Sequence, residues 1–328
     1  MRQIRAAAPP AVSIVVPCHN EEENLSQLYS RLTETCQAVC RDWEIILVDD
    51  GSSDSTWSLI VALASSDHHV VGVNLSRNYG HQIAVTSGLD RAMGDRVMII
   101  DADLQDPPEL LARMMRIMDE EAADVVYGKR VSRDDETLTK RLTAAVFYRV
   151  LRQMSGLAFP VDTGDFRLIS RRVVETLREM PEQQRYLRGM VGWIGFKQVP
   201  LEYERAPRHA GRTSYNYARM IRFAVDAFTS FTIAPLRLAS ACGLLCAILS
   251  VPLIGYTIVH WIKGDVVAGW TSLMSAILFF GSLQMMMLGI MGEYIGRLMI
   301  EAKRRPLYIV QNEINRSRVP GERESRVA

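Results

Sequence analysis

The sequence has no excess of charge of either sign, because 38 Lys and Arg residues stand against 37 Asp and Glu residues in 328, a formal net charge of +1. A dedicated nucleic-acid binder normally carries a strong basic excess, so we expect no nucleic-acid partner. Neither G-x-G-x-x-G nor G-x-x-x-x-G-K-S/T occurs, so neither the dinucleotide fingerprint nor a P-loop supports a nucleotide site. The five cysteines form no Cys/His metal set, and we interpret them as reduced structural thiols.

Charge is also absent from two long runs near the C-terminus. Residues 238–262 and 266–292 contain no Asp, Glu, Lys or Arg, and only Lys263, Gly264 and Asp265 separate them. About 20 apolar residues cross a bilayer as a helix, whereas core helices rarely extend so far without a charge. The runs therefore predict a hairpin of two transmembrane helices. Basic residues flank its outer ends, so the positive-inside rule places both chain termini in the cytoplasm.

These runs suggest a division of the chain into parts. Residues 1–10 are expected to be a flexible tail, and the apolar stretch that follows is too short for a signal peptide. Residues 11–214 are expected to form a catalytic domain. Residues 215–236 are expected to form a basic amphipathic helix, which lies at the membrane surface or packs on the sheet. Residues 237–296 hold the two predicted spans, and residues 297–328 a cytoplasmic tail.

Short apolar runs alternate with helical patterns through the first 130 residues. We predict helices at 21–39, 55–64, 82–92 and 107–120, and strands at 12–17, 44–48, 70–75, 96–100 and 125–128. This alternation predicts an α/β fold that is Rossmann-like, with a mainly parallel sheet and helices on both faces. Ligands bind such sheets at the carboxyl ends of strands. Polar clusters follow the first, second and fourth predicted strands: His19-Asn20-Glu21, Asp49-Asp50 and Asp101-Ala102-Asp103.

Two carboxylates one residue apart follow the fourth predicted strand, in Asp101-Ala102-Asp103. Alternate residues of an extended segment point the same way, so both carboxylates can face one ion, and Gln105 continues the spacing. Oxygen ligands suit Mg²⁺ or Mn²⁺, which would neutralise the charge that develops on a diphosphate leaving group. The alternative is a solvated acidic turn before the helix that begins near Pro107.

Further carboxylates and basic residues form a second set of candidates. Asp165 or Asp162 could face an acceptor, and Asp162 could instead cap a turn. A sugar hydroxyl would need a general base, whereas a phosphate monoester, with a second pKa near ~6, is largely dianionic and needs only positioning. Arg208 and Arg212, in a stretch that includes Ser214, match phosphates or an anionic membrane surface. The last pair, equally compatible with diphosphate binding or with a solvated loop, is Lys129 and Arg130.

These motifs together resemble family 2 glycosyltransferases with a GT-A fold. The similarity is to the polyprenyl-phosphate glycosyltransferases, the group of dolichol-phosphate mannose synthase and the bactoprenol glucosyltransferases of the GtrB type. The matching segments cover nearly the whole chain together with the two-span C-terminus: SIVVPCHNEEENL (13–25), ILVDDGSSDST (46–56), LSRNYGHQIA (75–84), DADLQDPPEL (101–110), VDTGDFRLISR (161–171) and RHAGRTSY (208–215).

The resemblance implies roles for residues at the matching positions. Asp103 would be the principal metal ligand, with Asp101 and Gln105 completing the site, and Asp165 the catalytic or acceptor-positioning carboxylate. Asp50 would contact the base. His19 stands where many relatives have Tyr, which leaves stacking on the base in doubt. The residues expected to bind the nucleotide sugar are Pro17, His19, Asn20, Glu21, Asp49, Asp50, Ser52, Asp101, Ala102 and Asp103.

The predicted reaction is the inverting transfer of a hexose, glucose from UDP-glucose, to undecaprenyl or another polyprenyl phosphate. The resemblance also implies a homotetramer in the bacterial inner membrane, whose lipid-linked sugar serves later glycan modification. The alternatives are another donor (UDP-GlcNAc, GDP-mannose or a UDP-aminoarabinose type) or a processive polysaccharide synthase. The synthases typically carry QxxRW, which residues 183–186 lack. A catalytically silent nucleotide-sugar binder would show a broken DxD, and this chain does not.

Overall fold

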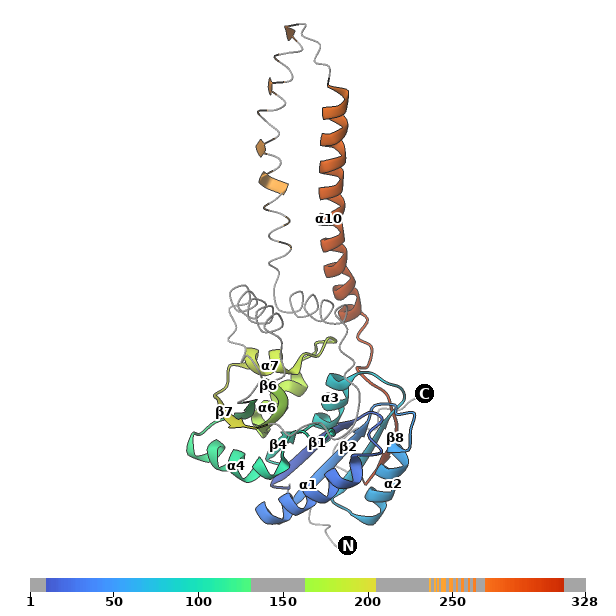
Figure 1. Cartoon of the computed structure of the whole chain (residues 1–328), viewed down its shortest axis with the longest axis vertical. Coiled ribbons are helices and arrows are strands. Elements are labelled where there is room, and N and C mark those ends of the chain that lie inside the picture. The colour runs from blue at the N-terminus through green and yellow to red at the C-terminus, as the bar shows by residue number, and fades with distance from the viewer. Residues whose placement is uncertain are drawn as a thin grey trace, which may run out of the picture. The chain divides into compact units, whose positions relative to one another are not determined.

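The computed structural model describes residues 10–130, 163–204 and 269–315, together with single helical positions between 236 and 263. The described residues fall into two compact units (Figure 1). Residues 10–130, 163–204 and 306–315 belong to the first, and the described positions between 236 and 305 belong to the second. The predicted N-terminal tail up to residue 9 and the predicted amphipathic helix up to residue 235 lie outside the described residues.

An eight-stranded sheet forms the centre of the first unit in the order β7-β5-β6-β4-β1-β2-β3-β8. The four central strands β4, β1, β2 and β3 are parallel neighbours, and β5 pairs in parallel with β7. β6 runs antiparallel to β4 and β5, and β8 antiparallel to β3, so the described sheet is mixed, with a parallel centre as predicted. The strands are β1 (Val12–Cys18), β2 (Trp43–Asp49), β3 (Val70–Leu75), β4 (Arg96–Ile99), β5 (Val125–Arg130), β6 (Thr163–Ser170), β7 (Gln198–Tyr203) and β8 (Val310–Ile314).

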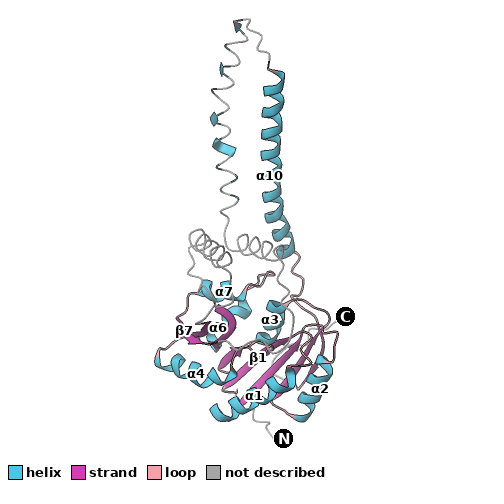
Figure 2. Ribbon diagram, viewed as in Figure 1, coloured by secondary structure: helices cyan, strands magenta, loops and turns pink. Residues whose placement is uncertain are grey.

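Helices cover both faces of the sheet (Figure 2). Ile14 and Val16 of β1 pack on one face with α1, α2 and α4, whereas Val15 packs on the other with α3, α6 and α7. Every residue of β1 is buried, as expected for a parallel strand covered on both sides. The helices are α1 (Leu25–Val39), α2 (Thr56–Ser66), α3 (His81–Arg91), η1 (Pro108–Leu110), α4 (Leu111–Glu120), α6 (Arg171–Glu179) and α7 (Leu187–Ile194).

The strands and helices predicted in the first 130 residues are all present, with boundaries shifted by a few residues. The largest shift is at α1, which begins at Leu25 although the pattern predicts a helix from residue 21. Residues 20–22 instead bond to the loop after β2 and to the start of α2: the Asn20 amide donates to Ser52 Oγ, and the Glu21 amide donates to Thr56 Oγ1 at 2.9 Å. These contacts hold the first polar cluster beside the second.

The segment after residue 297 is not the uniform tail that the sequence suggests. Helix α10 (Trp270–Ala302) extends beyond the end of the second apolar run, and residues 310–314 then pair with β3 as strand β8. The Arg91 guanidinium forms an ion pair with Glu313 (Nε to Oε1 3.1 Å), and Tyr308 Oη donates to Asp90 at 2.7 Å. The sequence does not predict this short polar strand, because the strand forms by hydrogen bonding to the open edge of β3.

In the second unit, Gly243 of the first apolar run lies next to α10: a Cβ placed on Gly243 would be 3.9 Å from the Met287 side chain. Large apolar side chains of α10 are exposed, among them Phe279 and Leu298. Within the described part of the chain, no helix has both the length and the apolarity that a membrane crossing requires.

Candidate active site

The first and second polar clusters meet because β1 and β2 are parallel and in register, with Cys18 opposite Asp49. Hydrogen bonds join the loops after these strands to each other, and another ties the second loop to the end of β2. The Asn20 amide donates to Ser52 Oγ (3.0 Å), the Ser53 amide donates to Asn20 Oδ1 (2.8 Å), and the Ser52 amide donates to Asp49 Oδ1 (3.2 Å). Burial raises the pKa of Asp49, and the Ser52 donors only partly offset it. This network holds Asn20, Asp49 and Ser52, three of the predicted nucleotide-binding residues, next to one another.

Asp50 holds the third loop of the site. Its two carboxylate oxygens accept the backbone amides of Tyr79 (2.7 Å) and Gly80 (2.9 Å), at the start of α3. Burial raises the Asp50 pKa despite these donors. The Asp50 carbonyl lies 3.1 Å from His19 Nδ1, and Asn78 Nδ2 lies 3.1 Å from His19 Nε2. Because the Asn78 amide donates, His19 Nε2 accepts and Nδ1 carries the proton. The base contact of Asp50 stays a prediction.

Asp101 lies two residues beyond β4, the strand that pairs with β1. Its Oδ1 atom is shielded from solvent and has no hydrogen-bond partner among the described residues, and His81 Nε2 is 3.6 Å away. Burial raises the pKa of Asp101 to about 6, while the neighbouring His81 opposes this shift. Asp103, one residue beyond buried Ala102, accepts the Gln105 amide at 3.2 Å. A solvent-shielded carboxylate oxygen without a donor, next to further oxygen ligands, fits a divalent cation.

Asp165 of β6 is buried and bonded at both oxygens. Oδ2 accepts His81 Nε2 (3.0 Å) and Gln82 Nε2 (3.0 Å), and Oδ1 accepts Arg188 Nε (2.8 Å) and lies 3.7 Å from Arg167 Nη2. Burial alone would raise the Asp165 pKa, but the His81 hydrogen bond and the two guanidinium groups hold it well below its usual range. Asp165 is therefore an anion at neutral pH.

His81 connects the two acidic centres, because its Nε2 lies 3.0 Å from Asp165 and 3.6 Å from Asp101. Partial desolvation lowers the His81 pKa, but the two carboxylates reverse this and raise it above its usual value. The motifs in the sequence predict no role for His81, Gln82 or Arg188. His81 and Gln82 belong to the LSRNYGHQIA segment, which was the available signal, whereas nothing in the sequence links Arg188 to Asp165.

Of the residues predicted to bind phosphate, the structure describes Lys129 and Arg130. Lys129 Nζ donates to Glu202 at 2.8 Å, and both side chains are exposed. Arg130 lies beside the Asp165 segment, because a Cβ on Gly164 would be 3.1 Å from its Nη2. Pro17 is buried in β1 opposite Val48. The candidates that lie outside the described residues are Asp162, Arg208, Arg212 and Ser214.

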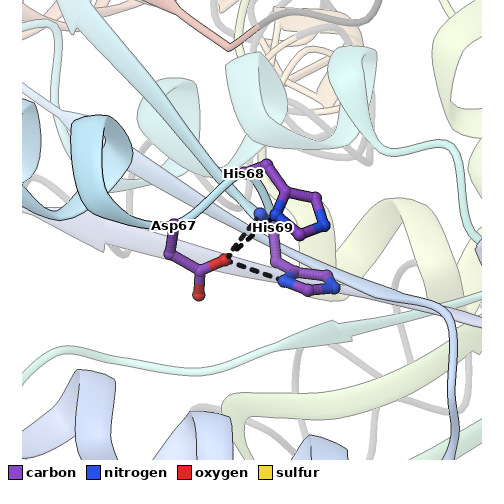
Figure 3. A group of neighbouring side chains, drawn as sticks. All are labelled: Asp67, His68 and His69. Atoms are coloured by element: carbon purple, nitrogen blue, oxygen red, sulfur yellow. Dashed lines mark hydrogen bonds and ion pairs between the residues drawn. The ribbon is translucent and has the colours of Figure 1, made fainter.

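Side chains of types that bind metals, from Asp67, His68 and His69, also lie close together among the described residues (Figure 3). The group directly precedes β3, so it lies at the amino-terminal ends of the parallel strands, opposite the carboxyl ends where the candidate site lies. The His69 ring donates from Nδ1 to Asp67 Oδ1 (2.8 Å) and stacks on Trp43 with centroids 4.1 Å apart. Because the facing nitrogen of His69 is already used, we interpret this group as closing the turn between α2 and β3.

Comparison with known proteins identifies the family of this chain. Residues 13–178 match glycosyl transferase family 2, and residues 234–298 match the GtrB C-terminal hairpin. The chain belongs to glycosyl transferase family 2 and is a glycosyltransferase with a C-terminal hairpin of the GtrB kind. The resemblance inferred from the sequence motifs is thus confirmed.

Relatives span almost the whole chain. A prophage bactoprenol glucosyl transferase homolog of Escherichia coli K12 is 40% identical over 301 residues, 92% of this chain and 98% of the relative. The bactoprenol glucosyl transferase of Shigella phage SfV is 39% identical over 303 residues, again 92% and 98%. A crystal structure of Mycobacterium tuberculosis glucosyl-3-phosphoglycerate synthase is 23% identical, with a TM-score of 0.48, over 67% of this chain and 79% of that chain.

Proposed function

We propose that this protein transfers glucose from UDP-glucose to a polyprenyl phosphate, with inversion at the anomeric carbon. The relatives of about 40% identity that carry the name bactoprenol glucosyl transferase support this reaction. The observation that carries it in the structure is the solvent-shielded Oδ1 of Asp101, which has no hydrogen-bond partner among the described residues and lies beside the His81–Asp165 pair. Such a carboxylate, at the strand ends where the nucleotide-sugar residues gather, is suited to a cation-bound diphosphate.

The donor side of the site would hold Mg²⁺ or Mn²⁺ through Asp101, Asp103 and Gln105. When bound, the cation supplies positive charge that neutralises the diphosphate leaving group. The chain itself orients the nucleotide: Asp49 and Asp50 fix the loops after β2 and β3, and residues 19–21 lie against them. Hydrogen bonds between the loops support a site that is oriented before the nucleotide binds.

The acceptor side explains why Asp165 need not remove a proton. Four donors or cations surround its two oxygens, and they hold its pKa well below the usual range, so it is a weak base. A phosphate monoester acceptor is already largely dianionic at neutral pH and attacks without a general base. We therefore assign Asp165 the role of holding His81, Gln82 and Arg188 around the acceptor.

The location follows from the hairpin. We propose that residues 238–262 and 266–292 anchor the protein in the bacterial inner membrane, with both termini in the cytoplasm, in a homotetramer. The match of residues 234–298 to the GtrB C-terminal hairpin and the exposed apolar side chains of α10 support a lipid environment. The polyprenyl acceptor resides in the same membrane, so donor and acceptor meet at its cytoplasmic face.

The test is transfer by membranes that contain the full chain. Membranes are incubated with Mg²⁺ or Mn²⁺, a short polyprenyl phosphate and a panel of radiolabelled nucleotide sugars. We expect glucose from UDP-glucose to enter the lipid fraction and Asp103→Ala to abolish this, whereas Asp119→Ala, at a surface ion pair with Arg96, should retain it. Incorporation of label from another nucleotide sugar would show that UDP-glucose is not the donor. Label found only in long polymer would refute polyprenyl phosphate as the acceptor.

A further inference from the structure

The side chain of Gln82 joins three elements of the first unit. Gln82 lies in the first turn of α3, and its Nε2 donates to Asp165 Oδ2 of β6 at 3.0 Å. Its Oε1 accepts the backbone amide of Leu187, the first residue of α7, at 3.0 Å. Both ends of the amide are therefore used, one on the acidic centre and one on a separate helix.

The contact with Leu187 caps α7. The first amides of a helix have no partner within it, and no side chain at the N-cap residue Tyr186 supplies one. Gln82 supplies the acceptor from another helix. The next residue, Arg188, donates from Nε to Asp165 Oδ1 at 2.8 Å, so the start of α7 sets where this guanidinium meets the carboxylate.

We propose that Gln82 is a positioning residue for the transfer reaction, which aligns Asp165 and Arg188 with each other through β6 and α7. The inference rests on the proposed function. The Arg188 side chain is 34% exposed, and the planar fork of an arginine suits phosphate oxygens. Displacing α7 by a fraction of an ångström would misplace this cation relative to the acceptor.

Only an amide can fill both functions of Gln82. Gln82→Glu keeps an acceptor for the Leu187 amide but removes the donor to Asp165 and puts a second carboxylate in its place. Gln82→Met keeps similar length without donor or acceptor, so α7 loses its cap. The two variants separate the contact with the carboxylate from the contact with the helix.

The chain offers a matched control at the other end of α7. Gln198 of β7 donates from Nε2 to the Val191 carbonyl at 3.1 Å and does not contact Asp165. Gln198→Met therefore removes one side-chain hydrogen bond to the same helix without touching the acidic centre. A general weakening of α7 would affect the Gln82 and Gln198 variants alike.

The experiment compares the full-length wild type, Gln82→Glu, Gln82→Met and Gln198→Met in detergent. It measures kcat, KM for UDP-glucose and for a short polyprenyl phosphate, thermal unfolding, and hydrogen exchange of residues 186–192. We expect kcat to fall roughly tenfold or more in both Gln82 variants, with KM for UDP-glucose within about twofold, because the loops after β1 and β2 are held by other bonds. Exchange at Leu187 should accelerate in Gln82→Met, and Gln198→Met should keep the wild-type kcat.

Other outcomes overturn the inference. Wild-type kcat in both Gln82 variants would do so, as would an equal loss in Gln198→Met or a loss that follows the unfolding temperature across all variants. An active wild type with unaffected Gln82 variants refutes the role of Gln82 alone. A wild type that transfers no sugar to any polyprenyl phosphate refutes the proposed function, and this role with it.

Discussion

Replacing Asp101 with Asn should stabilise the metal-free protein at neutral pH while it abolishes transfer. Burial raises the Asp101 pKa from 3.8 to about 6, and the nearby His81 does not compensate fully. A tenfold change in an equilibrium is worth about 1.4 kcal/mol, so ionising Asp101 in the folded state costs about 3 kcal/mol more than in the unfolded chain. An amide at this position carries no such cost.

The sign follows from proton binding. Between about pH 4 and pH 6 the folded protein retains a proton on Asp101 that the unfolded chain has released, so the free energy of unfolding decreases as the pH rises. The Asp101→Asn variant lacks this dependence. Its advantage over the wild type should therefore be near zero at about pH 4 and reach about 3 kcal/mol above about pH 7.

The assay is thermal unfolding of the full chain in EDTA at acidic and neutral pH. For a unit of this size, 1 kcal/mol corresponds to roughly 2–4 °C, so the midpoint of Asp101→Asn should be roughly 6–12 °C higher at neutral pH. Glu121→Gln, at an exposed ion pair with Lys197, should show no such gain. Saturating Mn²⁺ with UDP should narrow the difference, because ligand at about 100 Kd stabilises the wild type by about 2.7 kcal/mol. A variant that unfolds at or below the wild-type temperature in EDTA would refute the burial argument.

Two further predictions concern stability. Glu313→Gln should destabilise the first unit by about 1–3 kcal/mol, because it breaks the mostly buried pair with Arg91 that fastens β8 to α3, and a thermal midpoint equal to wild type would contradict this. Gly88→Ala should cost about 1–3 kcal/mol, because the added Cβ would lie 2.3 Å from Val15 Cγ1 of β1. Denaturant unfolding measures the loss of stability in Gly88→Ala. A midpoint equal to that of the wild type would show that α3 can shift without a cost in free energy.

Local pattern was sufficient for the central sheet and for part of the site. Fully buried parallel strands such as β1 appear as continuous apolar runs, so the strand ends and Asp101 could be located from the sequence alone. The edge strand β8 could not, because VQNEI is short and polar and gains its order from β3. The antiparallel β6 was missed for a related reason, since neighbours distant in sequence, β4 and β5, set its direction.

By itself, the sequence determined the family and the residue types of the donor site, because the motifs that carry them are contiguous and follow strands whose apolar pattern is local. It also established that the near-neutral chain contains two charge-free runs. Only the tertiary structure decided what surrounds Asp165: His81 and Gln82 come from α3 and Arg188 from α7, and packing of both helices on one face of the sheet brings them to one carboxylate. The hydrogen bond from Arg188 spans 23 positions of the sequence, and the one from His81 spans 84. Such bonds depend on the packing of distant elements, which no sequence period encodes.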